Sequence, residues 1–211
     1  MSVLRVCPRM IVSESAKIKE SIENAAPTIE PQYIDALMFL HKRLTKNHVE
    51  WAVGGELGEA LRAVQVKPEC IEIVTSKKGA AQIFLAVKEY APKGVYFQIQ
   101  KLDRNAVVDE KEYPVFLRSY YFEFSLGRIK VKVHGDLQFR IKDQDWSEKV
   151  SFNPEYMYVE GTKTAIVPLH IKYDIYRHLG WNDRIEKIMQ AAAKRPLILK
   201  RLVAACPQLA N

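Results

Sequence analysis

The residues best placed to do chemistry lie between Val49 and Ser76, where two adjacent glycines follow a strand-like run. Gly54 and Gly55 are followed at once by a helix-like run that begins at Glu56. Adjacent glycines let the backbone approach a ligand closely, and the free amides at a helix start favour an anion such as phosphate. An ordinary tight turn would use the same pair, whose spacing is neither a dinucleotide-binding nor a Walker A pattern. We predict that Gly54, Gly55 and Glu56 form a nucleotide-binding turn.

The next apolar run places one acid beside one thiol. Cys70 and Glu72 share one face of a predicted strand, because side chains alternate along strands. Phosphoryl transfer with Mg²⁺ needs paired carboxylates, since Mg²⁺ prefers oxygen ligands and bridges the phosphates of a nucleoside triphosphate (NTP). Glu72 is therefore the candidate metal ligand, with Mg²⁺ and NTP as the expected cofactors. The alternative is that Glu72 is an ordinary surface residue of the strand.

The stretch "WAVGGELGEALRAVQVKPECIEIV" resembles the start of the nucleotidyltransferase (polymerase-beta-like) fold, in the branch of small archaeal and bacterial proteins akin to aminoglycoside nucleotidyltransferases. The resemblance covers roughly Val49 to Ile188. It implies a glycine pair opening a helix, an Asp-x-Asp-like pair falling on Cys70 and Glu72, and a third acid on a neighbouring strand. Within "GRIKVKVHGDLQFRI" that third position falls on Lys132.

Two of the three acids implied by this family are therefore replaced, by a thiol and by a cation. Cysteine is a soft ligand that suits Mg²⁺ poorly, and a lysine repels a metal ion at close range. We expect a nucleotide- or phosphate-binding protein with an impaired metal site, in which Lys132 pairs with Glu72 where the metal would sit. One alternative is an active Mg²⁺-dependent transferase that moves NMP from NTP to an unknown acceptor through Glu72. Another is a non-catalytic, antitoxin-like module that binds nucleic acid or a partner protein.

Asp136 and Glu69 are the other carboxylates that could complete a metal site. Asp136 follows Lys132 on the same predicted strand face, about 13 Å further along at roughly 3.3 Å per residue. That distance makes it a poor third ligand of one metal. Glu69 faces away from Glu72 in a regular strand.

The elements that must position these residues alternate between helical and strand-like periods. The spacing predicts an α+β fold, a small mixed sheet with flanking helices and a C-terminal helical segment. Helices are expected near 14–25 and over 33–46, 56–64, 76–90, 169–179, 183–193 and 197–205. Strands are expected over 51–53, 71–74, 95–100 and 113–117, in a long hairpin around Leu126-Gly127, and in a short hairpin around Gly161. We divide the chain into an arm (1–28), a nucleotidyltransferase-like core (29–167) and a basic helical segment (168–211).

The composition and charge of the chain indicate which classes of binding partner to expect. The 211 residues carry a formal charge of +7, and the stretch from Pro168 to Asn211 holds eight Lys or Arg against three Asp or Glu. A basic end can attract phosphate, nucleic acid or a partner protein, although a solvated helix face would give the same count. Three widely spaced cysteines favour neither zinc nor a disulfide framework. No apolar run reaches about 18 residues and no secretion signal begins the chain, so we expect a cytoplasmic protein with no membrane partner.

Overall fold

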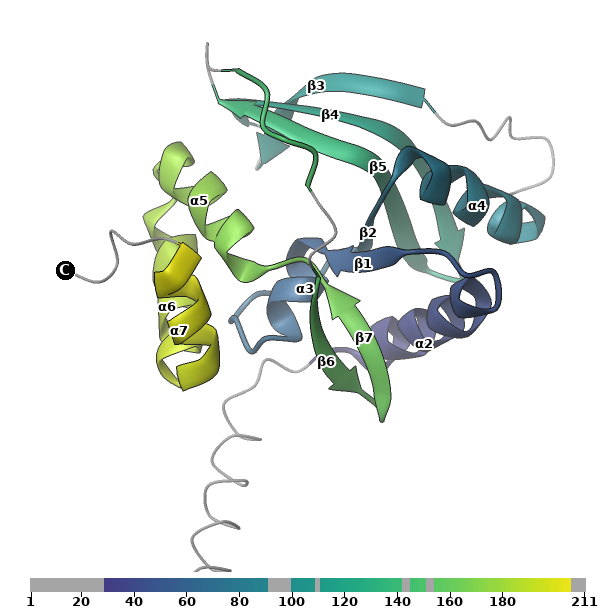
Figure 1. Cartoon of the computed structure of the whole chain (residues 1–211), viewed down its shortest axis with the longest axis horizontal. Coiled ribbons are helices and arrows are strands. Elements are labelled where there is room, and N and C mark those ends of the chain that lie inside the picture. The colour runs from purple at the N-terminus through teal and green to yellow at the C-terminus, as the bar shows by residue number, and fades with distance from the viewer. Residues whose placement is uncertain (1–28, 91–99, 109–110, 142–144, 151–153, 206–211) are drawn as a thin grey trace, which may run out of the picture.

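The computed structural model describes residues 29–90, 100–108, 111–141, 145–150 and 154–205. Their strands form a seven-stranded mixed sheet in the order β3-β4-β5-β2-β1-β7-β6 (Figure 1). The strands are β1 (Trp51–Gly54), β2 (Ile71–Thr75), β3 (Gln100–Val108), β4 (Lys111–Leu126), β5 (Ile129–Ile141), β6 (Glu155–Val159) and β7 (Thr162–Ile166). β2 pairs with β1 antiparallel and with β5 parallel, so it lies between them near the middle of the sheet.

Two helices pack on one face of this sheet and form the main core. Helix α2 (Pro31–Lys46) buries Tyr33, Leu37, Leu40 and Leu44, whose spacing follows the helical period. Helix α4 (Lys77–Val87) is capped by Ser76, whose side chain accepts a hydrogen bond from the amide of Gly79, and a single 3₁₀ turn (Lys88–Tyr90) follows it. These helices share one apolar cluster with the inward side chains of β1, β2, β4 and β5. Because side chains alternate along a strand, Glu72 lies on the opposite face of β2 from Ile71 and Ile73.

A second apolar cluster joins the C-terminal helices to the short helix α3 (Gly55–Ala60) and the loop after it. The C-terminal helices are α5 (Leu169–Leu179), α6 (Asn182–Ala193) and α7 (Pro196–Ala205). They form a separate group at the left of Figure 1, beside α3. The cluster includes Ala60 and Val64 from the α3 side, and Tyr176 and Ile188 from the C-terminal side. The C-terminal segment is therefore packed against the region that follows the glycine pair.

The predicted fold class is confirmed, and most elements lie within two residues of their expected bounds. Helix α3 is shorter than the predicted 56–64, because the chain turns after Ala60. The strand expected over 113–117 and the first strand of the long hairpin form one continuous strand, β4. Strand β3 covers residues 100–108, most of which were expected to form a loop between two strands. The predicted helix at 14–25 and residues 95–99 of a predicted strand lie outside the described residues. The three-part division of the chain stays a prediction.

The alternation predicted along β5 is interrupted. The pairing of β4 with β5 shifts register between Arg118 and Tyr120, which pair with Gln138 and Gly135. Asp136 lies within this bulge with a φ of 50°, a left-handed backbone that Asp tolerates better than most residues. The expectation that Asp136 continues the regular face of Lys132 is therefore wrong, because β5 holds one residue more than β4 between Gly135 and Gln138, and Asp136 lies in that stretch.

No helix in the described part of the chain is both long and apolar enough to cross a membrane.

Candidate functional site

Three predicted site residues lie side by side in the sheet. In the pairing of β1 with β2, Gly54 lies opposite Glu72. In the parallel pairing of β2 with β5, Glu72 lies opposite Lys132. The neighbouring strands needed for a Glu72–Lys132 ion pair are therefore present, and the ion pair itself stays a prediction.

The second glycine makes room for the Glu72 carboxyl group. Gly55 has a φ of +58°, and a Cβ added to it would lie 2.6 Å from Glu72 Cδ and 2.8 Å from Glu72 Oε2. Any side chain at position 55 would have to displace that carboxyl group. The glycine pair thus serves an internal contact, and the candidate acid lies directly against the predicted nucleotide-binding turn.

Cys70 is half-buried beside these charges. Burial and the Glu72 carboxylate raise the pKa of the Cys70 thiol, while Lys132 lowers it by its charge and by a hydrogen bond to the thiol. The net pKa is raised, so the thiol stays protonated near neutral pH. A thiol suits Mg²⁺ poorly in any case, because Mg²⁺ prefers oxygen ligands and sulfur ligands favour softer metals.

The C-terminal helices bring basic side chains to the acids of α3. Arg184 on α6 lies 2.8 Å from the carboxylate of Glu56, with Nη2 donating to Oε1. Glu59 is 1% exposed, and its Oε1 accepts a 2.8 Å hydrogen bond from the Tyr176 hydroxyl. Lys172 Nζ lies 3.6 Å from the same Oε1. The helix expected to bind phosphate therefore begins with an acid that is already paired.

Lys172 faces more than one glutamate. Burial by itself lowers the pKa of Lys172, but Tyr176, Glu59, Glu72 and Glu56 together outweigh it and raise the pKa well above its ordinary value. Lys172 is thus a permanent cation beside the candidate site. Burial, reinforced by Glu59, also raises the pKa of Tyr176 to about 12, against the opposing charge of Lys172, so its hydroxyl remains a donor.

Sequence reasoning did not single out Lys172, Tyr176 or Glu59, and it left open whether the C-terminal charges bind a partner or form a solvated face. A weak signal was present, since Lys172 and Tyr176 are four residues apart and so share a helix face. Nothing local indicated that this face would meet Glu59, because the contact spans 117 residues.

The donor set suits a divalent cation poorly. Within the described residues, no group of three or more His, Cys, Asp or Glu side chains could hold a metal ion. Two of the three acids that the family resemblance implies for a Mg²⁺ site are replaced, one by the thiol of Cys70 and one by the ammonium of Lys132. We therefore derive no reaction step through a metal.

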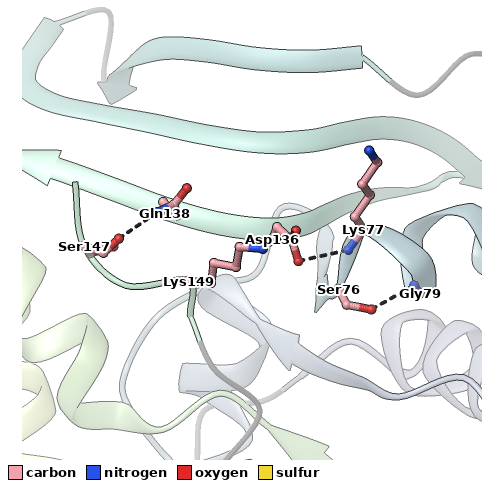
Figure 2. A network of polar contacts seen from close by, with 7 residues as sticks. All are labelled: Ser76, Lys77, Gly79, Asp136, Gln138, Ser147 and Lys149. Carbon is pink, nitrogen blue, oxygen red and sulfur yellow. Dashed lines mark hydrogen bonds and ion pairs between the residues drawn. The ribbon is translucent and has the colours of Figure 1, made fainter.

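Asp136 belongs to a different contact network, shown in Figure 2. One of its carboxylate oxygens accepts a hydrogen bond of 3.1 Å from the backbone amide of Lys77, at the start of α4. The other lies 2.8 Å from Lys149 Nζ. Burial raises the pKa of Asp136, but the hydrogen bonds from Lys149 and Lys77 and their charges outweigh it, so the net pKa is lowered. Asp136 therefore ties β5 to α4 and to the segment around Lys149.

With this geometry established, comparison with known proteins gives the family. The sequence model of the aminoglycoside-2''-adenylyltransferase family matches residues 36–193. The chain belongs to this family. The matched residues include the glycine pair, strands β2 and β5, and helices α5 and α6, which carry Lys172 and Arg184. The match confirms the resemblance to nucleotidyltransferases.

Solved structures agree with the family assignment. A crystal structure from Thermotoga maritima, provisionally assigned as a nucleotidyltransferase, is 26% identical, with a TM-score of 0.56 over 80% of this chain and 98% of its own. The solution structure of the antibiotic-resistance factor ANT(2'')-Ia is 12% identical, with a TM-score of 0.50 over 86% of this chain and 95% of its own. At that identity the second likeness shows the fold alone. No curated protein matches the chain.

Proposed function

We propose that this chain binds a nucleoside triphosphate beside Gly54, Gly55 and Glu72, and that Lys132 supplies positive charge that a metal ion would otherwise bring. The observation that carries the proposal is the register of β5 against β2, which sets Lys132 opposite Glu72. The lowering effect of Lys132 on the pKa of the Cys70 thiol supports it, because it indicates that the ammonium lies close to Cys70 as well as opposite Glu72.

The same residues argue for weak or absent transfer. Phosphoryl transfer depends on charge stabilisation at the transferring group, which metal ions provide in most such enzymes. A single lysine offers point-charge contacts to phosphate but cannot bridge two oxygens and activate an acceptor as a coordinated metal does. We infer binding that persists without Mg²⁺, with an impaired metal site at Glu72.

An active transferase is the second candidate, and family membership together with the retained Glu72 favours it. It requires Mg²⁺-dependent consumption of NTP that is lost in Glu72→Gln. The acceptor and the preferred base stay open in both proposals, as does a nucleic-acid or protein partner for the basic C-terminal end.

Calorimetric titration of ATP into the pure protein, with Mg²⁺ and again with EDTA, tests the proposal. We expect similar affinity in both, and on the order of tenfold weaker binding in Lys132→Met, the scale of one charge-assisted contact. Lys130→Met is the matched control, since Lys130 lies on the same strand with a half-exposed side chain near Glu123.

Each outcome decides between the candidates. Binding that disappears in EDTA would refute Lys132 as the built-in cation and favour the working transferase. No binding in either buffer would refute nucleotide binding and leave an interaction module as the better hypothesis.

A further inference from the structure

The buried Glu59 carboxylate is the least satisfied charged group beside the candidate site. Its Oε1 contacts Tyr176 and Lys172, whereas its Oε2 is buried without a hydrogen-bond partner among the described residues. A buried carboxylate oxygen without a partner costs free energy, so a fold that only needed packing would favour an apolar side chain there. The presence of a glutamate at this buried position is better explained by the contacts that Oε1 makes with Tyr176 and Lys172.

That oxygen anchors two side chains of one helix. Lys172 and Tyr176 lie one turn apart on α5, and both reach Glu59 Oε1. Tyr176 is itself fixed by stacking on Trp181, with ring centroids 5.3 Å apart and planes 25° apart. The Tyr176 ring and hydroxyl therefore fix the position of α5. Because Lys172 is on the same helix, they also fix the position of its backbone.

The contact with Glu59 positions the Lys172 ammonium but leaves some of its hydrogen-bond donors available. At 3.6 Å the ion pair with Glu59 is loose, and the Lys172 side chain is 27% exposed. An ammonium group has three donors, so donors remain for a ligand. Glu59, the partner of Lys172, lies on α3, and the first residue of α3, Gly55, lies against the Glu72 carboxyl group, so Lys172 lies beside the site formed by β2 and α3.

We propose that Glu59 and Tyr176 are positioning residues that hold the Lys172 ammonium as a second phosphate-binding cation, contributed by the C-terminal helices. The inference rests on the proposed nucleotide binding and extends it to a residue outside the predicted sheet site. It also gives the C-terminal segment a part in the site, because the site is incomplete until α5 packs on α3.

ATP affinity measured by calorimetry in EDTA, over a series of salt concentrations, tests the inference. We expect Lys172→Met to bind on the order of tenfold more weakly, with a shallower salt dependence because one charge contact is gone. Lys172→Arg should recover most of both. Lys194→Met, which removes an exposed charge at the end of α6, is the matched control and should change neither.

Tyr176→Phe tests whether the position of the Lys172 ammonium matters for ATP binding, and not only its charge. It keeps Lys172 but removes the hydroxyl that holds Glu59, so we expect ATP affinity to fall by about threefold to tenfold with the shallower salt dependence. If Lys172→Met does not fold, Glu59→Gln combined with Lys172→Gln removes both charges together and should show the same loss.

The outcomes distinguish this inference from the function on which it rests. If the wild-type protein binds ATP and both Lys172→Met and Tyr176→Phe bind it equally well, the network is structural only and the inference is overturned. If the wild-type protein does not bind ATP, nucleotide binding and the inference fall together.

Discussion

Replacing Gly55 by Ala tests the contact on which the candidate site is built. Any L-residue at a left-handed position costs about 1–2 kcal/mol. At Gly55 the new Cβ would also lie 2.6 Å from Glu72 Cδ, so the glutamate must move. The contacted atoms belong to the outer part of a flexible, half-buried side chain, so its displacement adds about 1 kcal/mol, the lower end of the range for overpacking. We therefore expect Gly55→Ala to lower the free energy of unfolding by about 2–3 kcal/mol.

Gly161→Ala is the matched control. Gly161 has a φ of +72°, and nothing lies within 4 Å of a Cβ added there. Both substitutions change the unfolded chain alike, so that contribution cancels. Gly161→Ala should cost only the backbone strain, about 1–2 kcal/mol. Urea denaturation at pH 7 measures both values.

A double-mutant cycle with Glu72→Ala isolates the contact. Without the carboxyl group, Gly55→Ala should cost no more than Gly161→Ala, which gives a coupling free energy of about 1 kcal/mol. Equal costs for the two glycine substitutions in the wild-type background, or a coupling near zero, would refute the conclusion that the Glu72 carboxyl group lies against Gly55.

Three further substitutions test the surrounding contacts by urea denaturation. Tyr176→Phe should cost about 1–3 kcal/mol, because Glu59 loses its hydrogen-bond donor inside the protein; an unchanged midpoint would contradict that bond. Asp136→Asn should cost about 1 kcal/mol at pH 7. Because the folded pKa of Asp136 is lowered, its stabilisation is present above the unfolded pKa and should vanish as the pH falls from about 4 through the folded pKa; a pH-independent difference would exclude this linkage. Ser76→Ala should cost about 1 kcal/mol through loss of the cap on Gly79, whereas Ser76→Thr should retain most of it.

Local patterns in the sequence were sufficient for most elements of the fold. Helix α5 has the predicted bounds, and the hairpin around Gly161 forms where its turn signal stands. Period and turn chemistry act over a few residues, so they are visible without a partner segment. The bulge at Asp136 was not visible, because an extra residue in one strand is defined only by the strand that pairs with it.

The sequence by itself determined that a glycine pair opens a helix, that Glu72 lies on the strand that follows, and that Lys132 stands where the family resemblance implies an acid. The expectation that Cys70 shares that strand was wrong, because Cys70 lies in a bend one residue before β2. Only the tertiary structure decided which charges meet. The parallel pairing of β2 with β5 joins strands without a shared turn, so its register follows from packing of the whole sheet. The contact of Glu59 with Lys172 and Tyr176 likewise exists because two apolar surfaces, distant in sequence, bury one another. The charges beside the site are thus set by where the C-terminal helices pack.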